Sequence, residues 1–562
     1  KIIIEAHVTF YRIIFRGFYK ERLQGPASNH HSSASLPSPR KKKKKSRNIQ
    51  NQDHPRKRKK MEILIYLSWV LLLALFSFVF LKKKNQRLPP GPRGLPIIGI
   101  LHQFTGIPHK WFHQLSLKHG PVMSLPLGLT TAVVISSSEA AEEVLKTKDV
   151  ETCTRPQMLG ARRLSYNFKD ITFAQFTDTW KENRKVSMVE LLNFKKLQTF
   201  KSLKEEEMDF MVKKISNSAL EQSPVDINNI SMGLVSHILC RSSLGQNLHT
   251  NKFFDEERII QLVMEGSLAT GEFGVADFFP GKLGNFADWL LQRKRVILEK
   301  MFKELDDFYQ HVIDDHLKSL DGPKGTDPSA DIVSGMLNLV DKNGTPGSKR
   351  NLDQVKGVLM NLFLGGIDTV AIILIWAMTE LIRNPRAMKK AQEEIRSVLG
   401  DKREKLTEED LEKVKYLKLI VKETFRLHPS VPTIPRESMS PITIQGYDIP
   451  AKTRMYINVW AIGREAKVWK NPEEFIPERF IDSDVHFKGQ HYELLPFGSG
   501  RRLCPAVSFA SGTIEFGLLN MLYFFDWSLP DGVVAEDIDM GDIGNISFYK
   551  KVPLVLVPVK HH

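Results

Sequence analysis

The stretch FGSGRRLCPA, residues 497–506, places a single cysteine, Cys504, behind a glycine-rich turn and beside two arginines. Gly498 and Gly500 let the backbone bend sharply and approach a flat molecule closely. An apolar run from Ser508 to Phe525 follows, and the N-terminal amides of the helix expected there would stabilise a thiolate. The stretch fits a thiolate ligand of haem iron. Taken alone, it fits a small buried cysteine before an ordinary helix equally well.

The positive charge of this 562-residue chain is concentrated at its start. The formal net charge is +16, and residues 1–60 carry 17 Lys and Arg against three acids. The remaining 502 residues therefore have a net charge of only +2. Runs such as 40–47 and 56–60 are usually just solvated, so we expect no nucleic-acid partner. With 42% hydrophobic residues, the body can bury a sizeable core.

The three cysteines, Cys153, Cys240 and Cys504, form neither a CxxC pair nor a zinc-binding spacing. An odd number with such spacing predicts no disulfide framework, which fits a reducing compartment.

The segment Ile63–Leu81 predicts a membrane anchor. It has 19 residues without charge, just long enough to span a hydrocarbon core of ~30 Å, and we assign residues 61–81 to the anchor. The basic residues that follow, Lys82–Lys84, would stay in the cytosol with the bulk of the chain. The basic run 56–60 on the other side conflicts with this topology, although it could instead be a nuclear-localisation run. A start at Met61 removes the conflict, so we expect residues 1–60 to be a non-native upstream extension.

Beyond the anchor, residues 82–99 form a basic, proline-rich linker, and residues 100–562 form one domain. Helical patterns dominate between residues 140 and 400. Short strands are expected near 121–126, 132–136, 442–449 and 552–559. The fold class is therefore mainly α with small β-sheets.

A single helix is expected over Leu352–Arg383, capped by Asn351 and ended by Asn384-Pro385. Its middle reads GGIDT, residues 365–369, and two glycines inside a helix cost ~1 kcal/mol each relative to alanine. Close approach of a flat ligand would explain them, and so would tight packing of another helix. The threonine can bond back to the carbonyl four residues before it, and an acid beside a hydroxyl suits a proton relay.

Two further pairs carry charge on one helix face. Glu423 and Arg426 are three residues apart, and Arg479 could join them in a network of one carboxylate and two guanidinium groups. Trp180 and Arg184 lie one turn apart and could together bind a buried carboxylate. Each pair alone is equally typical of an ordinary amphipathic helix.

These residues, in this order, resemble a cytochrome P-450. The resemblance covers Met61 to His562: the anchor, the PPGP hinge, WxxxR, GGxDT, ExxR, PERF and the FGSGRRxC loop. Each motif is weak to moderate alone, but their joint occurrence is highly specific. The sequence is most similar to plant microsomal members of the A-type group, as found in subfamilies expanded in the mustard family. The resemblance implies the cytochrome P-450 fold, with a long central helix over the haem and a single N-terminal transmembrane helix.

The resemblance also implies roles for individual residues. Cys504 would be the proximal ligand of the iron of haem b, with Phe497 packed beside the thiolate. Asp368 and Thr369 would manage dioxygen and its protons, while the Glu423 network would hold the haem loop. The haem propionates would be contacted by Trp180, Arg184, Arg436 and Arg502.

The implied activity is a haem-thiolate monooxygenase of secondary metabolism. It would insert one oxygen atom from O2 into a small apolar plant metabolite, with electrons from NADPH delivered by a cytochrome P-450 reductase. It would be held by membrane lipid as a single-pass protein of the endoplasmic reticulum, with its catalytic domain in the cytosol. The substrate would contact 155–175, Leu362–Thr369, Val431–Ile434 and Gly544–Phe548, and the reductase would dock near Lys181, Lys185 and Arg501.

Two departures and two alternatives accompany this assignment. Ala506 stands where glycine is usual and could crowd the start of the following helix, and Lys181 stands where arginine is common. A non-redox haem-thiolate isomerase or dehydratase is one alternative, although such members often lack the threonine that is present here. A non-catalytic haem-binding relative is the other.

Overall fold

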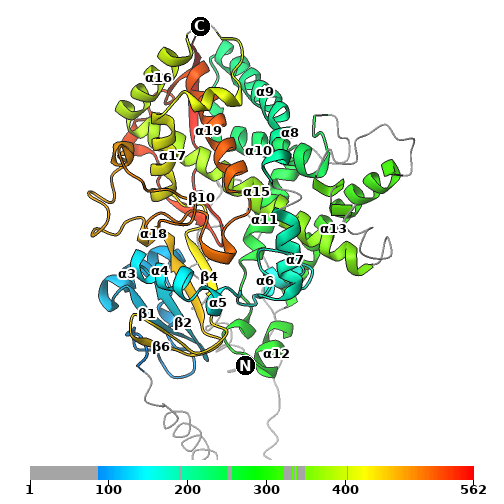
Figure 1. Ribbon diagram of the computed structural model, residues 1–562, viewed down its shortest axis with the longest axis vertical. Helices are drawn as coiled ribbons and strands as arrows, with labels where there is room; N and C mark the ends of the chain where they lie inside the picture. The colour runs from blue at the N-terminus through cyan, green and yellow to red at the C-terminus, as the bar shows by residue number, and fades with distance from the viewer. Residues whose placement is uncertain are drawn as a thin grey trace, which may run out of the picture. The chain divides into compact units, whose positions relative to one another are not determined.

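The computed structural model describes residues 87–188, 193–249, 256–290, 292–320, 332–334, 336–337, 349–400 and 403–561 (Figure 1). The chain divides into two units, Lys1–Leu88 and Pro89–His562, and nearly all described residues belong to the second. The expected extension (1–60), anchor (61–81) and first part of the linker (82–86) lie outside the described residues.

Helices make up most of Pro89–His562, which confirms the predicted mainly α fold class (Figure 1). Their bounds are α3 (Pro108–His119), α4 (Ser138–Glu142), α5 (Asp149–Thr152), α6 (Leu159–Leu164), α7 (Asp178–Val186), α8 (Phe194–Thr199), α9 (Lys201–Leu220), α10 (Ile227–Leu244), α11 (Glu256–Thr270), α12 (Lys282–Leu290), α13 (Gln292–Leu320), α15 (Lys349–Arg383), α16 (Pro385–Leu399), α17 (Tyr416–Leu427), α18 (Val459–Ile462) and α19 (Val507–Phe524).

The strands form small sheets. Their bounds are β1 (Val122–Leu127), β2 (Thr130–Ile135), β3 (Val225–Asp226), β4 (Thr433–Glu437), β5 (Ile442–Ile444), β6 (Tyr447–Ile449), β7 (Arg454–Asn458), β8 (Phe525–Ser528), β9 (Asp542–Gly544), β10 (Phe548–Lys550) and β11 (Val555–Lys560). The largest sheet has the order β1-β2-β7-β4, in which only β2 and β7 run parallel.

The predicted strands agree with this in part. β1, β2 and β11 lie where strands were expected, whereas residues 442–449 form the hairpin β5–β6 instead of one strand. β4 and β7 were not predicted. β4 contains a proline and two charged residues, and it forms by pairing with β7 from Thr433↔Asn458 to Glu437↔Arg454. Pairing partners distant in the sequence outweigh weak local propensity in such strands.

Helix α15 is the core element of the domain and contacts α10, α11, α17 and α19 (Figure 1). Its 35 residues span ~52 Å. Leu352–Arg383 is long and apolar enough to cross a membrane, but 72% of its most apolar window is buried among the other elements, as befits a core helix. The predicted cap is wrong: the helix begins at Lys349, so Asn351 lies within its first turn. The end is confirmed at Arg383, before Asn384-Pro385.

Candidate functional site

Cys504 lies at the end of a tight turn that requires glycine. Gly498 and Gly500 have φ of 71° and 67°, and a Cβ on Gly500 would lie 2.5 Å from Oδ1 of Asp149. The backbone N–H of Cys504 donates to the Phe497 carbonyl at 3.0 Å, which closes the turn. Burial raises the pKa of the Cys504 thiol, while the Ala506 backbone N–H and the Arg184 guanidinium oppose that rise. The turn thus presents one sulfur atom with a donor and a cation that favour its thiolate.

Ala506 stands directly before α19, where the resemblance leads us to expect glycine. Ala506 has φ of −100°, which any L-residue adopts, and its carbonyl accepts the Ala510 N–H at 2.8 Å. The backbone at the start of α19 is therefore regular, and the expected crowding by the Ala506 methyl group stays a prediction.

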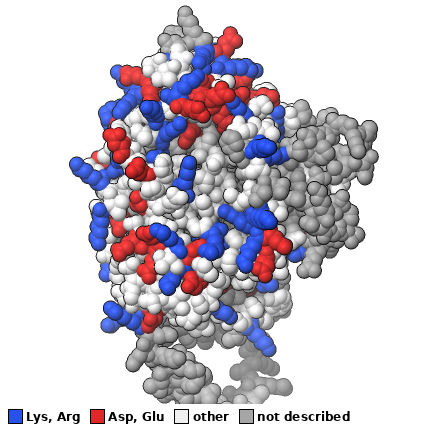
Figure 2. Space-filling model, in the orientation of Figure 1, with Lys and Arg blue, Asp and Glu red and all other residues white. Residues whose placement is uncertain are grey.

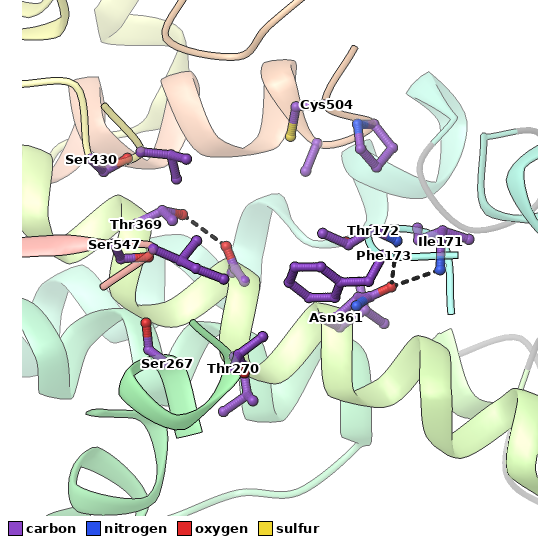
Figure 3. Close-up of a pocket in the computed structure, with 18 of the residues that line it drawn as sticks. Ile171, Thr172, Phe173, Ser267, Thr270, Asn361, Thr369, Ser430, Cys504 and Ser547 are labelled. Carbon is purple, nitrogen blue, oxygen red and sulfur yellow. Dashed lines mark hydrogen bonds between the residues drawn. The ribbon is translucent and has the colours of Figure 1, made fainter. Parts of the chain in front are cut away.

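The sulfur of Cys504 faces a cavity of about 350 Å³ (Figure 3). All four segments predicted to contact a substrate contribute to its wall, which is mostly apolar. The sequence did not indicate the contributions of α10 and α11, which supply Leu239, Ser242, Ser243, Ser267 and Thr270. α10 is buried over nearly its whole length and α11 is amphipathic, so nothing local distinguishes these residues from core positions.

The two glycines of α15 both line the cavity but have different surroundings, and helix packing accounts for one of them. A Cβ on Gly365 would meet no atom within 4 Å, because this glycine opens onto the cavity. A Cβ on Gly366 would lie 2.7 Å from Cδ1 of Leu239, because α10 packs against it. Gly365 thus leaves space for a ligand, and Gly366 allows a close helix contact.

This difference predicts opposite effects of two alanine substitutions. Gly365→Ala should raise the free energy of unfolding by ~1 kcal/mol through helix propensity. Gly366→Ala gains the same free energy from helix propensity, but its methyl group must displace Leu239. Overpacking of this kind costs ~1–3 kcal/mol, so this variant should be less stable than Gly365→Ala. Urea unfolding of the two variants side by side checks this. A Gly366→Ala protein as stable as Gly365→Ala would contradict it.

Of the acid–hydroxyl pair, the structure brings only Thr369 to the cavity wall. Its Oγ1 donates to the Gly365 carbonyl at 2.8 Å, which is the predicted back-bond, and the helix continues through it. Asp368 is 1% exposed and lies behind the wall, where its Oδ2 accepts a hydrogen bond from the Tyr549 hydroxyl at 3.0 Å. Burial raises its pKa, and the hydroxyl groups of Ser547, Ser267 and Tyr549 moderate the rise.

Two serines of the cavity wall act on Asp368. Ser267 and Ser547 line the cavity (Figure 3), and their hydroxyl groups lower the pKa of the Asp368 carboxyl. Oδ1 of Asp368 has no hydrogen-bond partner in the described part of the chain. The sequence did not indicate that hydroxyl groups of the cavity wall would act on this buried carboxyl.

Arginines gather where the cavity meets α7 and the cysteine loop. Arg184 and Arg502 line the cavity, and so does Arg155. No role of its own was predicted for Arg155 from the sequence. Arg436 lies behind them, wholly buried, and its Nε has no hydrogen-bond partner in the described part of the chain. Burial and the charge of Arg436 lower the pKa of Arg502 to about 9. An anionic ligand would offset the repulsion between these positively charged guanidinium groups and accept their hydrogen bonds.

Trp180 supports this cluster without lining the cavity. Thr177 caps α7 by accepting the Trp180 backbone N–H, and the indole N–H donates to the Ile171 carbonyl at 2.9 Å. The Arg502 guanidinium lies over the indole ring, 3.9 Å from its centroid. In this structure Trp180 therefore orients Arg502 and holds the 171 backbone, instead of offering its N–H to the cavity as expected.

The residues around the cavity fit a haem. Cys504 would supply a thiolate ligand on one side, and Gly365 leaves open space on the cavity wall. Arg155, Arg184 and Arg502 supply donors for two carboxylates at one edge, next to the unpartnered Nε of Arg436. Phe497 lines the cavity beside Cys504 and contacts the Phe425 ring, with centroids 5.2 Å apart.

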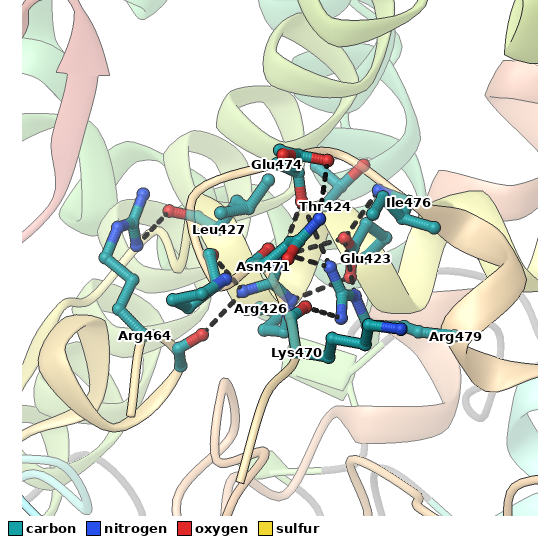
Figure 4. Close-up of polar contacts among 12 residues, drawn as sticks. Glu423, Thr424, Arg426, Leu427, Arg464, Lys470, Asn471, Glu474, Ile476 and Arg479 are labelled. Carbon is teal, nitrogen blue, oxygen red and sulfur yellow. Dashed lines mark hydrogen bonds and ion pairs between the residues drawn. The ribbon is translucent and has the colours of Figure 1, made fainter. Parts of the chain in front are cut away.

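The predicted network around Glu423 is present (Figure 4). Glu423 accepts two hydrogen bonds from Arg426 at 2.7 and 2.8 Å and one from Arg479 at 2.9 Å, and neither Glu423 nor Arg426 exposes its side chain. Arg426 also donates to the carbonyls of residues 463, 472 and 474. The network fixes the 463–476 loop to α17, whose Phe425 packs on the cysteine loop.

Comparisons with known proteins agree with this geometry. The cytochrome P450 family model matches residues 89–555. Cytochrome P450 71B22 of Arabidopsis thaliana is 50% identical over 502 residues, covering 88% of this chain and 99% of that protein. Cytochrome P450 71B4 of the same plant is 51% identical over 504 residues, covering 88% and 98%. In fold alone, a zebra fish cytochrome P450 structure with abiraterone matches with a TM-score of 0.66, at 23% identity over 81% of this chain and 99% of that one. The chain belongs to the cytochrome P450 family and is an oxidoreductase.

Proposed function

We propose that this protein is a monooxygenase that uses O2 to oxidise a small apolar plant metabolite, with electrons passed from NADPH by a membrane-bound reductase. The observation that carries this proposal is a single cavity, mostly apolar, with Cys504 on one side and Gly365 and Thr369 on another. A haem bound there supplies iron that binds and reductively activates O2.

The chain's own residues would hold and orient this group. Cys504 ligates the iron, and the arginines around Arg502 bind the carboxylates through forked donors. The apolar wall formed by Met158, Phe173, Leu364 and Ile546 excludes water and selects an apolar substrate.

Protons would come from the side of α15. Thr369 presents its hydroxyl to the cavity, and Asp368 holds a proton behind it because burial favours the neutral carboxyl. The hydroxyl groups of Ser267 and Ser547, which line the cavity and lower the pKa of Asp368, would carry that proton to the cavity.

Asp368→Asn tests this relay. We expect product formation to fall ~10²–10⁴-fold, the usual contribution of a positioned acid. Because the folded pKa of Asp368 is raised, the wild type loses stability as pH rises from 3.8 toward that pKa. The amide carries no such penalty, so the variant should be at least as stable at neutral pH. Urea unfolding and product assays at pH 7 check both, and a stable variant with unchanged turnover refutes the relay.

The reductase would dock beside α7, where Lys181 and Lys185 are exposed one turn apart. Arg501 belongs to the cysteine loop, which Arg184 of α7 joins to this helix by donating to the Leu503 carbonyl. Lys181 and Arg501 are held by Asp178 and Asp149, each at 2.8 Å. Lys181→Glu with Lys185→Glu should slow reduction by the reductase while carbon monoxide binding after chemical reduction is unchanged. Unchanged enzymatic reduction would count against this face.

Ile63–Leu81 would anchor the protein in the endoplasmic reticulum membrane with its catalytic domain in the cytosol. Deleting residues 1–84 should move the expressed protein from the membrane pellet to the supernatant. Retention of the truncated protein in the pellet after a high-salt wash would argue against a single anchor.

The central test is the carbon monoxide difference spectrum of the dithionite-reduced protein, followed by product formation in microsomes with reductase and NADPH. A thiolate-type Soret band and NADPH-dependent oxidation are expected. Turnover without NADPH would favour a non-redox reaction, and absence of the band in folded protein would falsify the proposal.

A further inference from the structure

A second cluster of ligand-type side chains lies away from the cavity, between α9 and α10, which pack together (Figure 1). It consists of Glu207 on α9, His237 on α10 and His249 just beyond α10, and we call it the His–Glu cluster. One ligand atom from each residue lies within 4.8 Å of the other two. Nε2 of His249 is 3.0 Å from Oε2 of Glu207, and Nδ1 of His237 is 3.8 Å from the same oxygen.

The cluster is separate from the catalytic site. Two residues along an α-helix amount to a rotation of ~200°, so His237 and the cavity-lining Leu239 leave nearly opposite faces of α10. None of the three residues lines the cavity.

Nδ1 of His237 points to a missing ligand. The His237 side chain is 8% exposed, and its Nδ1 is buried without a hydrogen-bond partner among the described residues. Its Nε2 lies 3.1 Å from Oε2 of Glu256, which fixes the proton of a neutral ring on Nε2. Nδ1 then turns a lone pair toward the Glu207 carboxylate, and two such acceptors 3.8 Å apart attract a cation between them.

The surrounding residues resemble the outer shell of a metal site. The Glu256–His237 contact is the carboxylate–histidine arrangement that orients metal-ligating imidazoles. Arg241 donates to Oε1 of Glu207 at 2.6 Å, which leaves Oε2 for the other two members of the cluster. Around the cluster, the carboxylates of Glu206, Glu207 and Glu256 face the cations Arg241 and Lys214, so negative charge is in excess.

The distances suit a transition metal of the zinc type. Ligand atoms of a tetrahedral zinc site lie ~2.0–2.1 Å from the metal and therefore ~3.3 Å from one another. Oε2 of Glu207 is 3.0 Å from Nε2 of His249 and 3.8 Å from Nδ1 of His237, distances that bracket this value. The imidazole rings stack 4.0 Å apart at 24°, so one must turn for both lone pairs to meet one ion. The His249 side chain is 32% exposed and gives an ion access from solvent. Its ring also contacts the exposed ring of Phe210, with centroids 4.3 Å apart, so Phe210 must move when His249 turns.

We propose that Glu207, His237 and His249 bind one zinc-type divalent ion, with water as the fourth ligand. The ion fastens α9, α10 and the end of the 245–249 segment together. Two imidazoles and one carboxylate match the preferences of zinc, whereas magnesium and calcium prefer oxygen ligands.

The test uses the haem-loaded full chain, purified through a tag without histidine and freed of metal with a chelator. Titration calorimetry with zinc chloride should give one zinc per haem iron, and magnesium chloride should give no binding. Elemental analysis after desalting measures the same ratio, with the haem iron as internal standard. The urea midpoint should rise with zinc.

Two variants identify the site. His249→Ala should weaken zinc binding more than ~100-fold, and Glu256→Gln, which removes an outer-shell partner, should weaken it ~10–100-fold. His119→Ala, at a half-buried histidine of α3, is the matched control and should bind zinc like the wild type. All three should keep the wild-type Soret absorbance, which shows that they fold. The proposal is overturned if the wild type binds no zinc. It is also overturned if His249→Ala and Glu256→Gln both bind zinc with the wild-type stoichiometry and affinity.

Discussion

Cys504→Ser is expected to abolish the thiolate-type carbon monoxide band and all NADPH-dependent turnover, while the helical fold is retained. The serine hydroxyl keeps the size of the thiol but does not supply a thiolate's electron donation to iron. The loop should still form, because its geometry rests on the positive φ of Gly498 and Gly500 and on the bond from the residue-504 N–H to the Phe497 carbonyl. The reduced carbon monoxide spectrum and far-UV circular dichroism measure the two effects.

Cys153→Ser is the matched control. Cys153 is buried near the arginines, and its Sγ donates to the Val150 carbonyl at 3.5 Å, a bond that a hydroxyl can also make. This variant should keep both the band and the turnover. If Cys504→Ser kept the thiolate-type band, or Cys153→Ser lost it, the ligand would have been assigned to the wrong residue.

Glu423→Ala is expected to give the largest loss of stability, ~3–5 kcal/mol, because it leaves the buried guanidinium of Arg426 and the part-buried one of Arg479 without their carboxylate. Both Glu423 and Arg426 have fully buried side chains, so water cannot replace the lost partner. The Ile476 backbone N–H, which donates to Glu423 at 2.8 Å, also loses its acceptor. We expect urea unfolding at a lower midpoint and weaker haem retention, since Phe425 beside this network packs on Phe497.

Glu393→Ala is the matched control for this effect. Glu393 also stands three residues before an arginine in a helix, but its side chain is 65% exposed and pairs with Lys389 at 3.7 Å. Arg396 pairs instead with Asp526 at 2.9 Å. Removing such a surface carboxylate changes the free energy of unfolding by ~0–1 kcal/mol. Similar losses in the two variants would mean that the Glu423 network contributes no more than a surface pair.

Several features of the site were predictable because their signals are local in the sequence. Positive φ at Gly498 and Gly500 follows from the residue type, and the back-bond of Thr369 needs only helix geometry. The Glu423–Arg426 pair shares one helix face, so its contact was also predictable, whereas its burial was not.

Other features were missed because they depend on packing between distant segments. Asp368 and Thr369 are neighbours, yet Thr369 faces the cavity and Asp368 faces Tyr549 on β10, which follows it by 181 residues. Arg155 joins the arginine cluster only because its segment folds against β4, itself a strand formed by pairing with β7. The N-terminal bound of α15 was misplaced because a cap signal is weak beside continued helical packing.

By itself, the sequence determined the mainly α class, the long central helix, the glycine turn that presents Cys504 and the family resemblance. Each rests on residue type or on short-range spacing, which constrain the backbone directly. Only the tertiary structure decided which glycine of α15 has open space beside it, which hydroxyl groups act on Asp368, and how Glu207, His237 and His249 meet. Those outcomes depend on which faces of separate helices are buried against one another, and burial is a property of the packed chain.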